Sequence, residues 1–152
     1  MLKIVGYKDI YAHSFRDLNI AWLEKFFVVE KMDVALLNDS KKEIINKGGY
    51  IFIALWNDTP AGCFAFIPNK DGFFELGKMA VSENHQGKKI GQEMLAHAVQ
   101  FAKSKDWKKI ILYSSTKLDT ALHIYRKFGF QEVPLEKDLP YARSDIKMEM
   151  EL

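Results

Sequence analysis

The chain has 152 residues, 48% of them hydrophobic, and a formal net charge of +2. This size and composition are those of one globular domain spanning residues 1–152, and the small charge excludes the strongly basic surface of a non-specific nucleic-acid binder. No apolar run is long enough to cross a bilayer, the chain begins without the pattern of a secretion signal, and Cys63 is the single cysteine. We therefore expect a cytoplasmic protein without disulfides or membrane contact, with Cys63 as a small core residue.

The first half of the chain predicts two helices and three strands. Apolar residues at helical spacing in 15–29 predict the first helix, and residues 32–46 predict a second one that breaks near 38–39. Ser40 and Glu43 have the spacing of a capping box for the part after this break. The predicted strands of this half are 3–7, 50–56 and 61–67, of which the last two form a hairpin around a turn at 57–60.

The second half predicts alternating strands and helices. Residues 68–72 form a turn, and Phe73–Val81 is an apolar strand that carries Glu75 and Lys78, the latter expected to face solvent or a gap. A polar break at 82–85 precedes a long helix. The elements expected after this helix are a strand at 110–114, a helix from Thr116 or Asp119 to about Phe128, a strand beginning at 130–133, a loop at 136–140 and a last strand at 145–152.

The resulting order of elements is β, α, α, β, β, β, α, β, α, β, β. An antiparallel meander that is followed by a β-α-β-α unit predicts a mixed sheet with helices packed on it, of the α/β (mixed α+β) class. The long helix carries an apolar stripe from Ile90 to Ala102, which indicates the face that packs on this sheet.

The first turn of the long helix has the features of an anion site. Backbone N–H groups at the start of a helix lack partners and carry partial positive charge. Gly87 and Gly91 allow a ligand to approach the backbone, and Lys88 and Lys89 add full charges. The alternative is an ordinary strand-to-helix connection with solvated lysines. The glycine spacing excludes a P-loop and a dinucleotide-binding fingerprint.

Two stretches resemble motifs of the GNAT superfamily of N-acetyltransferases. Gln86–Gly91 resembles the coenzyme A loop, Gln/Arg-x-x-Gly-x-Gly/Ala, with Lys89 in place of the middle glycine. This replacement is tolerable if the residue has ordinary helical torsions and damaging if the position needs a positive φ. Ala121–Phe130 matches the motif Asn-x-x-Ala-x-x-apolar-Tyr-x-Lys-x-Gly-Phe from its alanine onward, with Leu118 where the family has asparagine. The order of elements is also similar over nearly the whole chain.

The resemblance implies a GNAT-like fold. This is a mixed, mostly antiparallel sheet of six to seven strands, flanked by about four helices and splayed between its fourth and fifth strands. Acetyl-CoA (coenzyme A) would enter the gap between those two strands. The cofactor-binding residues that the resemblance implies are Met79, Ala80, Val81, Gln86, Gly87, Lys88, Lys89, Ile90, Gly91, Gln92, Leu118, Ala121, Tyr125 and Lys127.

Two residues have the positions of catalytic groups. Tyr125 matches the family's general acid, which protonates the sulfur of coenzyme A; the alternative is packing on an apolar helix face. Glu75 resembles the catalytic glutamate of the histone acetyltransferases of this superfamily, and its apolar neighbours would raise its pKa as a base requires. The alternative for Glu75 is an outward-facing side chain, with a chain of water molecules acting as the base.

Candidate acceptor-binding residues come from the two ends of the chain. Trp22 and Phe26 lie where GNAT acceptors bind over the first two helices, although such a stripe is also typical of a core helix. Arg143, in the last loop, is a candidate for binding an acceptor carboxylate. The four histidines have no metal-binding spacing, so we expect no metal. The resemblance also allows a homodimer.

The sequence therefore predicts an N-acetyltransferase that moves an acetyl group from acetyl-CoA to a primary amine of a small molecule or peptide. Direct attack in a ternary complex is expected, because Cys63 lies away from the matched residues and does not suit an acetyl-cysteine route. The first alternative is a non-catalytic acyl-CoA-binding or sensing module on the same fold. The second is an interaction domain without a cofactor. The acceptor is not specified by the sequence.

Overall fold

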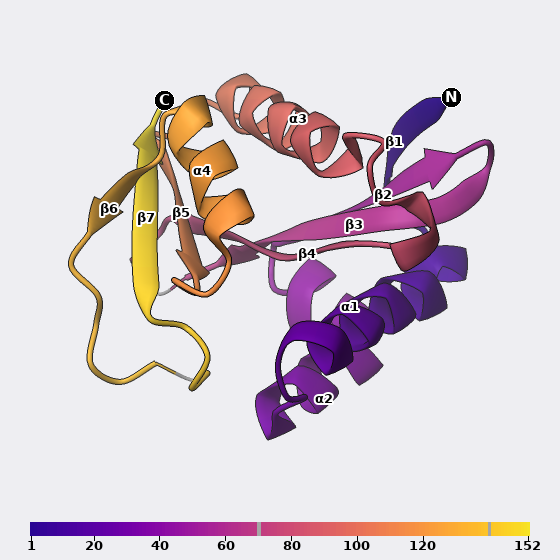
Figure 1. Cartoon of the computed structure of the whole chain (residues 1–152), viewed down its shortest axis with the longest axis horizontal. Helices are drawn as coiled ribbons and strands as arrows, with labels where there is room; N and C mark the ends of the chain where they lie inside the picture. Colours follow the sequence, from indigo (N-terminus) through magenta and orange to yellow (C-terminus); the bar gives the residue numbers. More distant parts are fainter. Residues whose placement is uncertain (70, 140) are drawn as a thin grey trace.

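The computed structural model describes the whole chain except residues 70 and 140, which fall within the turn and the loop predicted at 68–72 and 136–140. Its described residues contain a seven-stranded sheet with helices on both faces (Figure 1). The strands are β1 (Leu2–Gly6), β2 (Tyr50–Trp56), β3 (Thr59–Pro68), β4 (Phe74–Val81), β5 (Lys109–Ser114), β6 (Gln131–Val133) and β7 (Ile146–Glu151). The helices are α1 (Ala12–Phe26), α2 (Lys31–Asn38), α3 (Ile90–Ser104) and α4 (Asp119–Phe128), with short helical turns η1 (Asp9–Tyr11), η2 (Lys41–Ile45) and η3 (Glu83–His85).

The sheet opens between β4 and β5. Its strand order is β1-β2-β3-β4-β5-β7-β6, and β4 and β5 form the parallel pair in an otherwise antiparallel sheet. Only two residue pairs join these strands, Phe74 with Ile110 and Glu75 with Ile111. Beyond Glu75, β4 continues to Val81 without a β5 partner. The predicted mixed sheet, splayed between its fourth and fifth strands, is therefore confirmed.

Hydrophobic cores lie on both faces of the sheet. α3 and α4 cover one face and α1 and α2 the other (Figure 1). The first core includes Phe64 and Met94, and the second includes Phe15 and Cys63. Because β2 and β3 are covered on both faces, most of their residues are buried, which explains why they read as continuous apolar runs. Cys63 is a buried core residue, as predicted.

The second predicted helix differs from the structure at its cap. α2 ends at Asn38 and a separate π-helical turn covers Lys41–Ile45, which confirms the predicted break. The capping box predicted at Ser40 is wrong, because Ser40 is buried and its side chain makes no capping bond. The cap of α2 lies further upstream, where the N–H of Glu30 donates to Asp33 Oδ2 at 2.9 Å.

The last helix follows the predicted pattern. α4 ends at Gly129, which has φ +108 and so takes the left-handed conformation that glycine adopts without strain. Its N-cap, Leu118, supplies no side-chain hydrogen bond. Across the described part of the chain, the helices lack the combined length and apolarity that a membrane span requires.

Candidate active site

β4 contains a bulge where it leaves β5. Cys63 of β3 pairs with Ala80 and Ala65 pairs with Gly77, so that β4 has one residue more than β3 between these pairs. Within the bulge, Lys78 takes the left-handed conformation with φ +52. Bulges bend a strand and re-aim its side chains. This one lies at the opening of the sheet, where a ligand could contact the unpaired edge of β4.

Glu75 lies beside this bulge on the face of the sheet that carries α1 and α2. Its neighbour Leu76 packs in the opposite core, and successive strand residues alternate between faces. The Glu75 carboxylate folds over Gly77, since a Cβ placed on that glycine would lie 3.2 Å from Glu75 Oε2. Burial raises the pKa of Glu75 to about 7, and the charges of Lys78, Glu136 and Lys147 modify it. Glu75 therefore changes its protonation state near neutral pH, as a general base requires.

Lys78 belongs to a buried ionic network that joins three separate segments. Its Nζ lies 3.0 Å from Asp33 Oδ1 and donates to the Tyr141 hydroxyl at 3.1 Å. Arg143 binds the same Asp33 through two hydrogen bonds of 2.8 Å and reaches Glu30 Oε2 at 3.1 Å. The Lys78 side chain is 8% exposed and that of Asp33 is 0% exposed. The prediction that Lys78 faces solvent or the gap is wrong, because the bulge directs it to α2.

We expect Asp33→Asn to destabilise the protein by about 3 kcal/mol or more, because Lys78 and Arg143 would be left with unpaired charges in a buried site. Burial alone would raise the pKa of Asp33, but the bonds from Arg143 and from the Glu30 N–H, with the charge of Lys78, hold it below its usual range. This contribution is present above the unfolded pKa of about 3.9 and is lost as the pH falls through the lower folded value.

Urea unfolding at pH 7 and at pH 3 measures the effect. The difference in the free energy of unfolding between Asp33→Asn and the wild type should be smaller at pH 3 than at pH 7. The control is Glu43→Gln, which removes the exposed Glu43–Lys47 pair and should cost less than about 1 kcal/mol. If Asp33→Asn and Glu43→Gln lowered the free energy of unfolding equally, the result would contradict a stabilising role of the buried network.

The loop before α3 contains residues with a positive φ. Lys89 is the N-cap of α3 and has φ +60 and ψ +24, so of the two cases left open for this residue the structure has the unfavourable one, a positive φ. Gly87 also has a positive φ, of +80. The Glu93 N–H donates to the Lys89 carbonyl at 3.1 Å in the first turn of α3, and the N–H groups before Glu93 point out of the end of the helix. A Cβ on Gly91 would meet nothing closer than Val81 Cγ2, at 3.9 Å, so the approach to these N–H groups is open.

We expect Lys89→Gly to stabilise the protein by about 1 kcal/mol. Left-handed torsions cost a residue with a Cβ about 1–2 kcal/mol and cost glycine almost nothing. Part of this gain is offset because glycine has more conformational entropy in the unfolded chain. Chemical denaturation at pH 7 measures the difference. Lys88→Gly is the matched control, because Lys88 does not have a positive φ, and it should not stabilise. A loss of stability in Lys89→Gly would contradict the strained torsion.

Tyr125 belongs to α4, on the other side of the opening from β4 (Figure 1). The ring packs against the core and lies edge-on to Phe130, with the centroids 5.9 Å apart. Burial is the cause that raises the pKa of the hydroxyl to about 12, and no hydrogen bond contributes to this shift. Tyr125 therefore stays protonated at neutral pH, and its O–H is available as a donor. The ring packing that was the alternative for Tyr125 is present, and its role as the acid stays a prediction.

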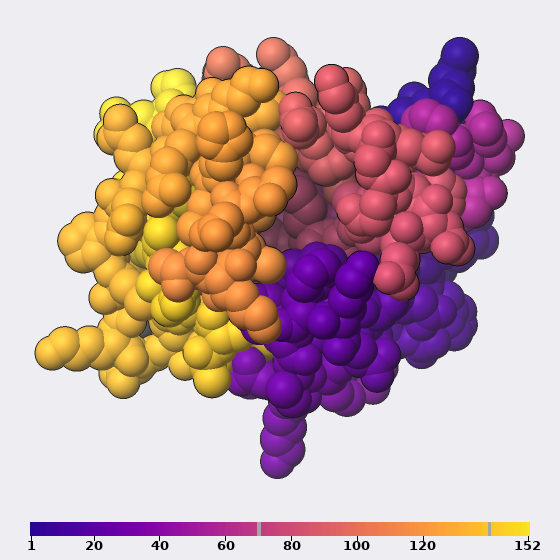
Figure 2. Space-filling view, viewed as in Figure 1, coloured from indigo at the N-terminus to yellow at the C-terminus, as the bar shows by residue number. Residues whose placement is uncertain are grey.

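A hollow in the surface lies between the elements that carry the predicted cofactor residues. Figure 2 shows it bordered by α4, by the start of α3 and by α1. Met79, Ala80 and Val81 belong to β4, the predicted loop residues 86–92 include the start of α3, and the predicted residues 118–127 cover the start and middle of α4. The structure thus brings the predicted cofactor segments to one region.

α1 and the β4–α3 connection enclose a pocket of about 430 Å³. Trp22 and Phe26 line it together with Val81 and Gln86. The rings of Trp22 and Phe26 are 5.4 Å apart and tilted. Two of the three residues predicted for the acceptor and two of those predicted for the cofactor therefore line one pocket, so the aromatic face of α1 borders the predicted cofactor loop and is not simply core.

The remaining predicted acceptor residue already has partners inside the protein. The Arg143 guanidinium binds Asp33 and Glu30, and its side chain is 16% exposed. Its binding of an acceptor carboxylate stays a prediction, and the geometry lends it no support.

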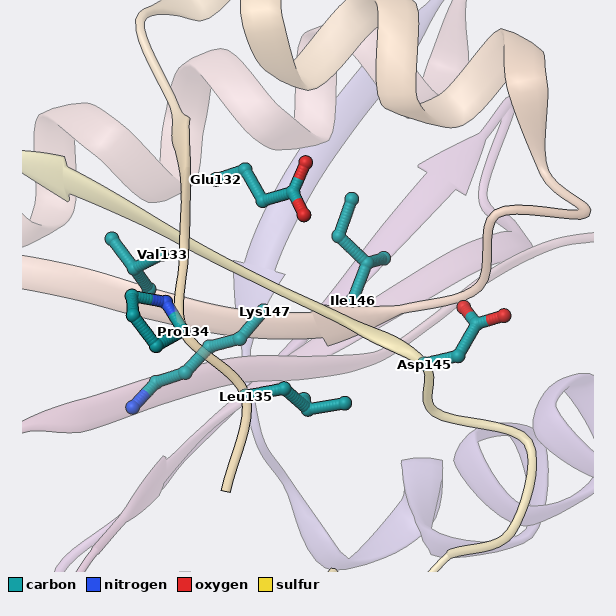
Figure 3. Close-up of a pocket in the computed structure, with 7 residues that line it drawn as sticks. All are labelled: Glu132, Val133, Pro134, Leu135, Asp145, Ile146 and Lys147. Atoms are coloured by element: carbon teal, nitrogen blue, oxygen red, sulfur yellow. The ribbon is translucent and has the colours of Figure 1, made fainter. Parts of the chain in front are cut away.

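A second pocket of about 430 Å³ lies beside β6 and β7, and Figure 3 shows Lys147 extending from β7 toward the segment that follows β6. Lys147 binds Glu136, which also accepts a hydrogen bond of 2.7 Å from the Tyr113 hydroxyl.

Several charged residues near Glu75 were not found from the sequence. These are Asp33, Glu136 and Lys147, together with the buried role of Lys78. Asp33 and Lys78 are 45 residues apart, and Arg143 is 110 residues from Asp33, so no local spacing indicated their contact. A charged residue inside an apolar strand, such as Lys78, was the one available signal, because lysine is buried only when it is paired.

The chain belongs to the GNAT acetyltransferase family. The model of the Acetyltransferase (GNAT) family matches residues 6–130, most of the chain. Among curated proteins, N-acetyltransferase 8F1 of Rattus norvegicus is 27% identical over 116 residues, which cover 73% of this chain and 51% of the relative. The chain thus spans about half the length of this relative.

Solved structures show the same fold. An acetyltransferase of the GNAT family from Staphylococcus aureus Mu50 superposes with a TM-score of 0.86 at 20% identity, covering 99% of both chains. The PaiA N-acetyltransferase of Thermoplasma acidophilum, solved in complex with coenzyme A, superposes with a TM-score of 0.75 at 16% identity, covering 100% of this chain and 99% of the other. At this identity the likeness concerns the fold.

Proposed function

We propose that the protein is an acetyl-CoA-dependent N-acetyltransferase that acts on a primary amine by direct attack in a ternary complex, with residues 1–152 as one catalytic domain. The observation that carries the proposal is the opening of the sheet, which has a donor on one side, Tyr125, and a carboxyl that titrates near pH 7 on the other, Glu75. Membership of the GNAT family supports the same chemistry.

The residues at the opening suit coenzyme A. The N–H groups at the start of α3, with Gly87, Gly91 and the charge of Lys88, would hold its pyrophosphate. The unpaired edge of β4 from Met79 to Val81 would lie along its pantetheine arm, and one strand N–H would polarise the thioester carbonyl. Leu118 lacks the amide of the family's asparagine, so α4 would contribute mainly through Ala121, Tyr125 and Lys127.

Two proton transfers follow from this arrangement. When bound, acetyl-CoA supplies a thioester whose acetyl carbon is open to attack by an amine. Glu75 accepts the proton that the amine nitrogen loses as the C–N bond forms. Tyr125 donates a hydrogen bond or a proton to the sulfur as the C–S bond breaks. A thiol resembling cysteine has a pKa of about 8.5, below that of Tyr125, so the hydrogen bond carries much of this stabilisation.

Calorimetric titration with acetyl-CoA tests the cofactor half of the proposal. We expect micromolar affinity in the wild type and at least about 10-fold weaker binding for Gly91→Trp, whose side chain would fill the space over the N–H groups. Gly91→Ala is the control, since its Cβ is accommodated at 3.9 Å from Val81 and affinity should be retained. No binding to the wild type would contradict the proposed function.

A further inference from the structure

Three described cations near Glu75, namely Lys78, Arg143 and Lys147, are each ion-paired. Lys78 binds Asp33 at 3.0 Å, and Arg143 binds Asp33 at 2.8 Å. Lys147 binds Glu136. These three cations are well shielded, with side chains 8%, 16% and 14% exposed. An incoming anion would therefore have to compete with a carboxylate that is already in place.

These groups and Glu75 form one wall. Glu75 pairs with Ile111 of β5, and two residues further on the same face of β5 is Tyr113, which pairs with Lys147 of β7. The Tyr113 hydroxyl donates to Glu136 at 2.7 Å. The charges of Lys78, Glu136 and Lys147 act on the Glu75 carboxyl, which shows that all three lie near it. An amine bound at Glu75 would lie close to these charges.

The charges on this wall cancel. Lys78, Arg143 and Lys147 are matched by the carboxylates of Asp33, Glu30 and Glu136. Ionised Glu75 therefore adds a negative charge to a set of side chains whose own charges cancel. A carboxylate on the acceptor would stay unpaired near Glu75 or displace an internal carboxylate, and both are unfavourable.

We propose, building on the proposed function, that the acceptor is a small primary amine that carries no carboxylate. Amines of the kind formed by decarboxylation of amino acids meet this requirement, whereas free amino acids do not. This reverses the prediction that Arg143 binds an acceptor carboxylate: the Asp33 and Glu30 carboxylates already occupy the guanidinium.

Matched acceptors test the inference. Cadaverine and lysine differ by one carboxylate, as do tyramine and tyrosine. Thiol release from acetyl-CoA gives kcat/KM for each, and we expect values at least 10-fold higher for the amine of a pair. Equal or faster reaction of the amino acid would overturn the inference, and so would failure of both amines when acetyl-CoA binds. Absence of acetyl-CoA binding would instead refute the proposed function.

A variant links the preference to the paired cations. Glu136→Gln leaves Lys147 without its carboxylate, and the Glu136 side chain is 47% exposed, so the fold should be retained. We expect the preference for cadaverine over lysine to fall at least threefold, through faster acetylation of lysine. Glu43→Gln, on η2, should leave it unchanged. An unchanged preference in Glu136→Gln would overturn the role of the paired cations.

Discussion

Tyr125→Phe is expected to lower kcat about 100-fold and to leave the affinity for acetyl-CoA within about twofold, because a positioned acid typically contributes 10²–10⁴-fold to the rate. The change removes one hydroxyl whose pKa is not shifted by any hydrogen bond, while the ring contact with Phe130 remains. The fold should therefore be unaffected. Steady-state thiol release and calorimetry measure the two quantities.

His123→Ala is the control for this prediction. His123 is exposed on the same helix, two residues before Tyr125, so the variant should retain full turnover. Unchanged kcat in Tyr125→Phe would remove Tyr125 as the acid. A loss of acetyl-CoA affinity equal to the loss of kcat would instead assign Tyr125 to binding.

Glu75→Gln is expected to lower kcat/KM, expressed per neutral amine, about 100-fold and to remove the acidic limb of the pH profile of this quantity. The correction for neutral amine is needed because an amine with a pKa of about 10.4 is mostly protonated near neutral pH in both proteins. In the wild type, activity should fall as the pH drops below about 7, because burial raises the pKa of Glu75 to about 7 and a protonated carboxyl accepts no proton. The variant keeps the size of the side chain without an ionisable group. Its pH profile should be flat across this limb.

Although Glu75→Gln should lower activity, it should raise the stability of the protein at high pH. A carboxyl whose folded pKa is raised destabilises the folded state as the pH rises through the range between its usual value, 4.5, and about 7. Glu75→Gln should therefore be more stable than the wild type at pH 8 and similar to it at pH 4. Glu132→Gln, at an exposed position on β6, is the control for both measurements. A pH limb that persists in Glu75→Gln would favour a base made of water molecules.

The fold was predictable because its signals are local. Alternation and apolar runs identified the strands, and Gly129 indicated the end of α4. The opening between β4 and β5 came from resemblance to the family, since no spacing in the sequence shows how far two strands stay paired. The capping box at Ser40 failed because tertiary packing buries this residue and α2 is capped at Glu30.

The sequence predicted the cofactor-binding segments of the candidate site, but it did not predict the ion-paired residues near Glu75. The loop at 86–91 and the motif around Tyr125 are continuous in sequence, so a pattern can find them. The positive φ of Lys89 was not predicted because lysine rarely adopts it. The network of Asp33, Lys78 and Arg143 depends on the bulge in β4, and side chains that meet only after folding leave no periodic pattern.

A crystal structure of the acetyl-CoA complex tests the central claim most directly. The account predicts the pyrophosphate on the N–H groups at the start of α3, the pantetheine arm along β4 from Met79 to Val81, and the sulfur within hydrogen-bonding distance of the Tyr125 hydroxyl. The acetyl carbon should face the side of the sheet that carries Glu75. A cofactor bound away from the opening between β4 and β5, or a sulfur directed away from Tyr125, would contradict it.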